Sequence, residues 1–199
     1  FVHRAVRDRV VDKIVEIARS IRLGMPEDDA TQFGPLASFS HRDRVAQIVN
    51  QARADGGDIL VGGSPPARKD LALGAFYLPT VVDGLTNSSH LCQNELFGPV
   101  LCVLPFDNEE QLIRDANDTA FGLACGIWTN DFSRAWRVAR EIQAGTVWIN
   151  TYRQNSVTTP FGGYKHSGVG RERGTQALRQ YQQIKSIFVS TTTTPMNFN

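Results

Sequence analysis

The sequence predicts an α/β fold in which strands and helices alternate to build a doubly wound parallel sheet. Apolar stretches of strand length recur along the chain, separated by segments whose apolar residues repeat every three or four positions, as in an amphipathic helix. The strand segments are almost continuously apolar, as expected for strands that are buried on both faces. Because neighbouring parallel strands need a crossover connection, this strand–helix–strand order favours parallel pairing.

The first half of the chain contains two predicted helices. In the first, Val10, Ile14 and Ala18 form an apolar stripe along one face. Gly24 can provide the left-handed cap that ends this helix. The elements predicted in this half are a strand end at residues 1–3, a helix over 6–23, a helix that Ser40 caps and that ends at Gly56, and strands over 58–62 and 77–82.

Strands and helices alternate more regularly in the second half. A helix is predicted to begin at Asn108, because the sequence Asn-Glu-Glu-Gln resembles a capping box. The other elements predicted in this half are strands over 100–106, 123–129 and 146–151, helices over 133–143 and 175–183, and a final strand over 184–190. The last strand would lie at the edge of a sheet and would need to be covered. The polar tail after it is predicted to be frayed.

Composition and charge exclude several classes of function. The chain has 199 residues, of which 41% are hydrophobic and 21% are charged, as in an ordinary soluble globular domain. The net charge is only +1 and the basic residues are scattered, which argues against binding to nucleic acid or to an anionic membrane. No apolar run approaches the roughly 20 residues that span a bilayer. Because the chain opens at Phe1 without a start methionine, we expect further sequence upstream.

The three cysteines are predicted to be structural. Their odd number and the absence of Cys-x-x-Cys spacing argue against a disulfide framework and against a zinc site, and no metal site is predicted. Cys102 and Cys125 lie in apolar strand segments, and Cys92 shortly precedes Glu95. No histidine or other base adjoins any of them to generate a thiolate. We therefore expect three small buried apolar side chains in a protein of a reducing, cytoplasmic compartment.

Two segments carry candidate binding chemistry. The first contains Glu95, whose two carboxylate oxygens could hold a vicinal diol such as a ribose, and Phe97, whose flat ring could pack against another ring. On these residues alone, the structural interpretation of an exposed Glu95 and a core Phe97 is favoured over a binding role. The second is the loop Pro160–Gly174, whose five glycines match neither the Rossmann nor the Walker A spacing. This loop is predicted to be a constrained turn with positive φ, and it follows the carboxyl end of a strand, where doubly wound folds bind ligands.

The chain resembles the aldehyde dehydrogenase superfamily. The superfamily's glutamate-phenylalanine-glycine-proline motif is matched by Glu95, Phe97, Gly98 and Pro99. Further matches occur in the same order as in the family, at Gly34-Pro-Leu36, Leu78-Pro-Thr-Val81, Phe121-Gly-Leu-Ala124, Trp148-Ile-Asn150 and the Pro160–Gly174 loop. The resemblance covers most of residues 1–190, and it is the ordered set rather than any single motif that makes it specific.

The resemblance implies roles for several residues. Glu95 would hold the nicotinamide ribose of NAD or NADP, and Phe97 would pack near the nicotinamide. Phe161 would fall in the aldehyde entrance pocket, with Tyr152 near it. Asn155 departs from the family, because many members have an apolar or aromatic pocket residue there. The polar loop 152–159 also contains Arg153, whose guanidinium matches a carboxylate, so we hypothesise an aldehyde with a polar or anionic tail. The alternative, which the sequence favours, is that Arg153 points to solvent or pairs with a neighbouring acidic residue at an interface.

The resemblance also implies that no catalytic residue lies in this chain. In the family a cysteine thiolate attacks the aldehyde, hydride passes to the cofactor, and a glutamate activates the water that hydrolyses the thioester. These residues and the dinucleotide-binding domain would lie upstream, in an N-terminal half of the same enzyme, so residues 1–199 alone are predicted to be inactive. Residues 1–183 would form an incomplete catalytic domain. Residues 184–199 would form an oligomerisation strand and tail that pair with a partner subunit in a homodimer or homotetramer.

Two alternatives remain open on the sequence. One is a related reductase that transfers the acyl group to coenzyme A or acts on an acyl phosphate. The other is a non-enzymatic member of the family that serves as a structural or binding protein.

Overall fold

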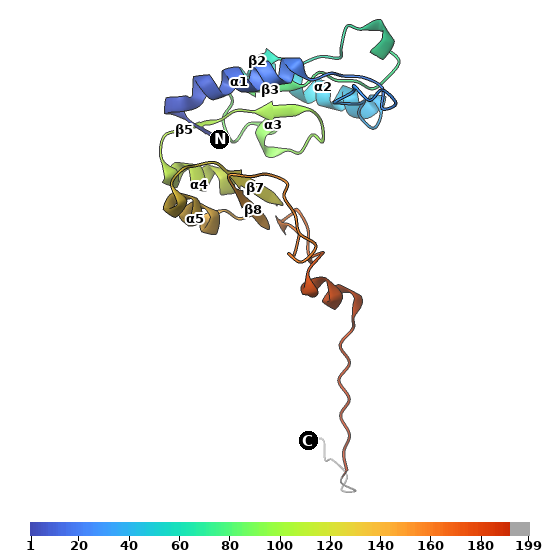
Figure 1. The fold of residues 1–199 in the computed structure, drawn as a ribbon, viewed down its shortest axis with the longest axis vertical. Coiled ribbons are helices and arrows are strands. Elements are labelled where there is room, and N and C mark those ends of the chain that lie inside the picture. The colour runs from blue at the N-terminus through green and yellow to red at the C-terminus, as the bar shows by residue number, and fades with distance from the viewer. Residues whose placement is uncertain (192–199) are drawn as a thin grey trace. The chain divides into compact units, whose positions relative to one another are not determined.

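The computed structural model describes residues 1–191, and the chain forms two compact units (Figure 1). The first unit comprises Phe1–Ala120 and Trp136–Ile142. The second comprises Phe121–Ala135 and, of the described residues, those from Gln143 to 191. The α/β class is confirmed, because helices and strands alternate in the described residues and several of the strand pairs are parallel. Residues 192–199, which include most of the predicted tail, lie outside the described part of the chain.

A three-stranded sheet forms the centre of the first unit. Its strands are β2 (Asp58–Val61), β3 (Thr80–Asp83) and β4 (Val100–Cys102), in that order. Strand β3 is antiparallel to β2 and parallel to β4, so this sheet is mixed rather than wholly parallel. A separate parallel pair joins β1 (Val2–His3) to β5 (Pro105–Phe106). The predicted strand over 100–106 is therefore two short strands that belong to different ladders.

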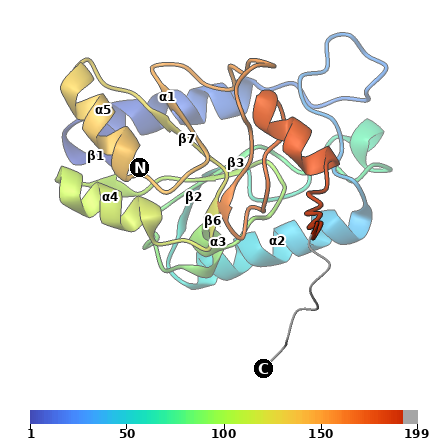
Figure 2. The ribbon, with the colours of Figure 1, turned by 90° about the horizontal axis from the view of Figure 1, so that it is seen from below.

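Helices cover both faces of β3. The helical segments of the first unit are η1 (Arg4–Val6), α1 (Arg7–Ser20), α2 (Phe39–Ala54), η2 (Lys69–Leu71), α3 (His90–Gln93) and α4 (Glu109–Asn117). Val81 packs in a cluster with Val11 of α1, whereas its neighbour Val82 packs with Val45 of α2. Because successive side chains of a strand point to opposite faces, α1 and α2 lie on opposite sides of the sheet, as Figure 2 shows.

The ends of the helices follow from local hydrogen bonds. Helix α2 is capped by Ser38, whose Oγ accepts a hydrogen bond from the His41 N–H at 3.1 Å, so the prediction that Ser40 caps this helix was wrong. Both serines offer the same chemistry, but only Ser38 has the extended backbone of an N-cap residue. Asn108 caps α4 as predicted, and its Oδ1 accepts from the Gln111 N–H at 2.9 Å.

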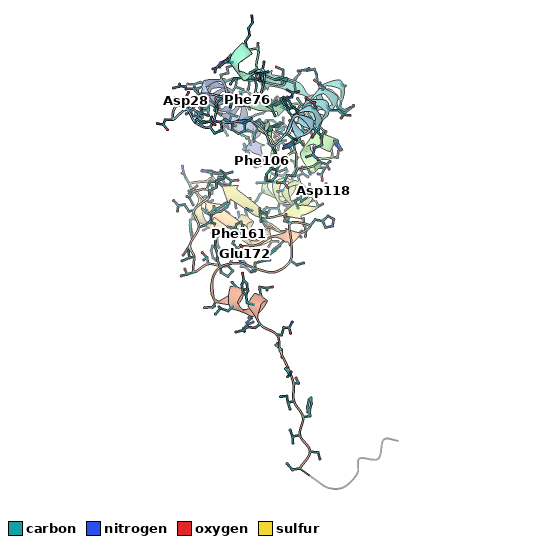
Figure 3. The ribbon with its side chains drawn as sticks, turned by 90° about the vertical axis from the view of Figure 1, so that its right-hand side faces the viewer. Asp28, Phe76, Phe106, Asp118, Phe161 and Glu172 are labelled. Carbon is teal, nitrogen blue, oxygen red and sulfur yellow. The ribbon has the colours of Figure 1, made fainter. Side chains whose placement is uncertain are left out.

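The second unit contains two small two-stranded sheets. Its elements are β6 (Phe121–Gly122), β7 (Ala124–Ile127), β8 (Thr146–Ile149), β9 (Tyr164–Lys165) and η3 (Thr175–Tyr181), and helix α5 (Phe132–Glu141) begins in this unit and ends in the first. Strands β7 and β8 are parallel, whereas β6 and β9 are antiparallel. Phe161 and Glu172 exchange two backbone hydrogen bonds of 2.8 Å across the Gly-rich loop, and Figure 3 labels both residues.

The predicted final strand is not formed within the described residues. Residues 182–191 have no assigned secondary structure, and the predicted helix before them is the 3₁₀ segment η3. The apolar side chains of this stretch are exposed, namely Ile184, Ile187, Phe188 and Val189. Within residues 1–191, no helix is both long and apolar enough to cross a membrane.

Tyr77 provides a test of the packing in the first unit. Its side chain is fully buried in the core beneath α2, and its hydroxyl has no hydrogen-bond partner among the described residues. Burial raises the pKa of Tyr77 to about 12, from an ordinary value of 10.0. The stability that the neutral phenol contributes is therefore fully present below pH 10 and is lost as the pH rises from 10 to 12.

We predict that Tyr77→Phe leaves the free energy of unfolding at pH 7 unchanged or raises it by up to about 1 kcal/mol, because it removes a buried hydroxyl without a partner. The variant should also lose less stability than the wild type between pH 10 and 12. Urea unfolding of both proteins at pH 7, 10 and 12 would measure these differences. A variant that is clearly less stable at pH 7 would show that the hydroxyl has a partner in solution.

Candidate functional site

The candidate site is the segment that joins α3 to β4. Glu95 and Phe97 are exposed here, whereas Leu96 between them is buried in the core cluster around α2. The alternation places one side chain inward and its two neighbours outward, so the buried leucine anchors a segment that presents a carboxylate and an aromatic ring. The prediction that Phe97 could be a core residue was wrong, because 79% of its surface is exposed.

Hydrogen bonds to two of its backbone carbonyls hold this segment on both sides of Phe97. The Leu96 carbonyl lies 2.9 Å from Nε2 of His41, which belongs to α2. The Pro99 carbonyl accepts a hydrogen bond of 2.8 Å from the N–H of Thr80, the first residue of β3. The segment is therefore fixed to the central strand of the sheet and to the helix that covers it.

Phe97 has an unusual backbone conformation. Its φ is +58°, in the left-handed region that bulky residues rarely adopt. The next residue, Gly98, packs closely on α2, because a Cβ there would lie 3.1 Å from the Val45 side chain, which would have to shift slightly. A strained conformation of this kind persists only where the surroundings impose it, and it occurs frequently at ligand-binding sites.

A pocket of about 280 Å³ lies along the segment. Its lining residues all belong to the first unit and are Leu91, Asn94, Glu95, Leu96, Phe97, Gly98, Val100 and Cys102. Asn94 is turned back onto α3, where its Nδ2 donates to the His90 carbonyl at 2.9 Å. Among the residues that line the pocket, Glu95 therefore provides the carboxylate.

The other predicted site residues lie in the second unit. Tyr152, Arg153 and Asn155 are exposed on the loop after β8. The Tyr152 ring lies 5.0 Å from the Trp148 ring between centroids, and the Arg153 guanidinium lies 5.8 Å from the centre of the Tyr152 ring. Asn155 donates to the Arg153 carbonyl at 3.3 Å.

Phe161 lies on the Gly-rich loop of the same unit and is half-buried. The Arg173 guanidinium lies 5.5 Å from the centre of its ring, so one face of the ring is covered by a cation. The prediction of positive φ in this loop is confirmed at Gly168, Gly170 and Gly174. The structure therefore groups Glu95 with Phe97 in one unit, and Phe161 with the loop residues Tyr152, Arg153 and Asn155 in the other.

Two of the three cysteines, Cys102 and Cys125, have little of the character of a nucleophile. All three are free and half-buried. Burial raises the pKa of the Cys125 thiol, and the pKa of Cys102 is raised by its interaction with Cys92 and by burial. The pKa of Cys92 is lowered by a hydrogen bond from Cys102, although burial opposes this effect. Among residues 1–191 there is also no cluster of three histidine, cysteine or acidic residues that could hold a metal ion.

Two contributors to the site are not among the residues that the sequence predicted. His41 lies 55 positions from Leu96, and the spacing of neither residue predicts their contact. The inward position of Leu96 was also missed, although alternation along Glu95-Leu-Phe97 is the signal that could have indicated it.

The fold and this segment define an α/β protein with a surface pocket edged by a glutamate and a strained phenylalanine. The sequence model of the aldehyde dehydrogenase family matches residues 1–187, so the chain belongs to the aldehyde dehydrogenase family. The chain is 46% identical over 189 residues to a betaine aldehyde dehydrogenase of Brucella melitensis. The matched region covers 95% of this chain and 39% of that protein.

Solved structures agree with this assignment. The aldehyde dehydrogenase of Bacillus cereus in complex with NAD+ superposes with a TM-score of 0.89 at 40% identity, covering 96% of this chain and 38% of that one. Betaine aldehyde dehydrogenase of Staphylococcus aureus in complex with NAD+ gives a TM-score of 0.87 at 38% identity, covering 90% and 35% respectively. The chain thus spans about two fifths of the length of the relatives that it matches.

We predict that the stability of Phe97 variants depends on how well the new residue tolerates positive φ rather than on the size of its side chain. Phe97→Val should lower the free energy of unfolding by about 1–3 kcal/mol, because a β-branched side chain is strained in this region. Phe97→Gly should leave it within about 1 kcal/mol of the wild type, since glycine adopts positive φ freely and little burial is lost. Urea unfolding would compare the three proteins, and equal destabilisation by valine and glycine would contradict the observed conformation.

Proposed function

We propose that this chain is the C-terminal part of an NAD(P)-dependent aldehyde dehydrogenase that oxidises an aldehyde to a carboxylic acid. In this proposal the chain provides the groups that contact the nicotinamide end of the cofactor, part of the aldehyde pocket, and much of the scaffold of the catalytic domain. The observation that carries it is the exposed pair Glu95 and Phe97, held at the edge of a pocket by a buried leucine.

The residues present fit the nicotinamide ribose. The Glu95 carboxylate is exposed, and its two oxygens can each accept a hydrogen bond from a ribose hydroxyl. The exposed Phe97 ring offers an apolar face to a planar ring. When bound, NAD or NADP would accept the hydride from the substrate. The part of this chain is to orient the cofactor, because Glu95 would hold the ribose while Phe97 would limit the movement of the nicotinamide.

The catalytic groups are proposed to lie upstream of this chain. There a cysteine thiolate would attack the aldehyde, its backbone N–H and an asparagine amide would hold the oxyanion, and a glutamate would activate water for hydrolysis of the thioester. The raised pKa values of Cys102 and Cys125 support this assignment, since neither thiol is disposed to ionise. The two aldehyde dehydrogenases in complex with NAD+ support the choice of cofactor.

The end of the chain is proposed to mediate assembly. Residues 1–183 would form the catalytic part, as an incomplete doubly wound sheet that the upstream half completes. Residues 184–199 would provide a strand that pairs with a sheet in a partner subunit of a homodimer or homotetramer. The exposure of Ile187, Phe188 and Val189 supports this role, because an apolar stretch of this length is normally covered.

The substrate is proposed to be an aldehyde with a polar tail. Arg153 supports an anionic tail, because it is exposed and forms no ion pair among the described residues. The names of the relatives instead indicate betaine aldehyde, a quaternary ammonium cation that a nearby arginine would repel. The aromatic rings of Trp128, Trp148 and Tyr152, which lie against one another, could accommodate such a cation.

We predict that Glu95→Gln in the full-length enzyme will lower kcat/KM for NAD about tenfold or more while the melting temperature stays nearly unchanged. The amide still offers one acceptor but loses the charge-assisted hydrogen bonds to the ribose. Glu110→Gln, at an exposed carboxylate on α4, serves as the matched control. Unchanged kinetics together with a lowered melting temperature would instead indicate a structural role for Glu95.

We further predict that Arg153→Gln will lower kcat/KM about tenfold for aldehydes with a terminal carboxylate and will spare neutral aliphatic aldehydes, since only the former lose an ion pair. Arg153→Lys, which keeps the charge, should retain most of the activity. Initial rates with succinic semialdehyde, hexanal and betaine aldehyde would be compared in the three proteins. Equal losses with all three substrates, or a wild-type preference for betaine aldehyde, would rule out an anionic tail.

A further inference from the structure

His41 connects helix α2 to the candidate site. Its Nε2 lies 2.9 Å from the Leu96 carbonyl oxygen in a partly buried position. A carbonyl can only accept, so Nε2 must carry the hydrogen and donate it. This hydrogen bond joins residues that are 55 positions apart, and it ends on the peptide group between Leu96 and Phe97.

The N-terminus of helix α2 fixes the position of His41. The His41 backbone N–H donates to Oγ of Ser38, which caps α2. Val45 follows one turn later on the same face of the helix and lies against Gly98. Helix α2 therefore meets the segment at two points, with a hydrogen bond before Phe97 and a packing contact after it.

The peptide group that His41 contacts determines where the neighbouring side chains point. The peptide unit is rigid, so holding the Leu96 carbonyl restricts the orientation of the Leu96–Phe97 peptide. Phe97 follows with its strained φ of +58°, and such a conformation needs support from outside the residue. Because Leu96 is buried, a rotation of this peptide would displace the exposed groups of Glu95 and Phe97 rather than the leucine.

We propose that His41 is a positioning residue for the cofactor, which acts by holding the Leu96 carbonyl so that Glu95 and Phe97 face the nicotinamide ribose. This inference rests on the proposed function for the identity of the ligand. His41 need not touch the cofactor or the aldehyde for this role. Its loss should therefore weaken binding of the cofactor selectively and leave recognition of the aldehyde unchanged.

A matched pair of amide substitutions separates positioning from general stability. Glutamine at position 41 can place its amide N–H near the position of Nε2, whereas asparagine is one methylene shorter and cannot reach the Leu96 carbonyl. We expect His41→Gln to keep the KM for NAD within about twofold of the wild type. We expect His41→Asn to raise it about three- to tenfold, with the KM for the aldehyde unchanged, because one hydrogen bond is lost.

The measurement uses the full-length enzyme, with steady-state kinetics for both substrates and hydrogen–deuterium exchange without cofactor. Exchange in the peptide that spans residues 92–102 should be faster in His41→Asn than in the wild type or in His41→Gln. His41→Leu, which has no donor, should behave like His41→Asn and serves as a second variant if asparagine perturbs the helix.

The proposal would be overturned if His41→Asn and His41→Leu left both the KM for NAD and the exchange unchanged. It would also be overturned if they lowered the melting temperature and kcat with no change in the KM for NAD, or if neither variant folded, because either result indicates a purely structural role. A wild-type enzyme without turnover with NAD or NADP would instead contradict the proposed function. In that case the exchange rates alone would decide whether His41 holds the segment.

Discussion

The buried strand β3 is the constraint on which the first unit depends. All four of its residues are buried, so its backbone groups must find partners within the protein. Strand β2 pairs with one edge and β4 with the other, while α1 and α2 cover the two faces. At its end, the buried Asp83 forms an ion pair with Arg7 at the start of α1. The position of β4, and with it the segment that contains Glu95, follows from this pairing.

The proposed cofactor contact is a consequence of this arrangement. The first hydrogen bond of the β3 edge joins the Thr80 N–H to the Pro99 carbonyl, two residues after the strained Phe97. The buried Leu96 side chain and the bond from His41 complete the support. A flexible loop could present the same two side chains, but it would lose more conformational entropy on binding. The scaffold thus fixes in advance two side chains that the proposed chemistry requires.

Much of the fold could be predicted from local patterns. The apolar stripe of the first helix and the capping sequence at Asn108 correspond to α1 and α4, because periodicity and capping depend on neighbouring residues. The antiparallel direction of β2 could not be predicted, since an apolar strand has the same composition in either direction. The last apolar stretch, at residues 184–190, has the pattern of a strand but lacks a pairing partner among the described residues.

The candidate site was predictable in its chemistry but not in its geometry. The family motif pointed to Glu95 and Phe97, whereas the positive φ of Phe97 is not visible in a sequence, because a bulky aromatic residue gives no signal of such a conformation. The contact of His41 with Leu96 depends on how α2 packs against the sheet, and no local pattern encodes a contact across 55 positions. The roles of Phe161, Tyr152, Arg153 and Asn155 stay predictions, because they depend on the parts of the enzyme that would surround them.

A crystal structure of the full-length enzyme with NAD+ bound would test the central claim most directly. We expect both Glu95 carboxylate oxygens to lie within hydrogen-bond distance of the nicotinamide ribose hydroxyls, with Phe97 still at positive φ and its ring beside the nicotinamide. A cofactor whose ribose is held by other residues, with Glu95 directed into solvent, would contradict the account.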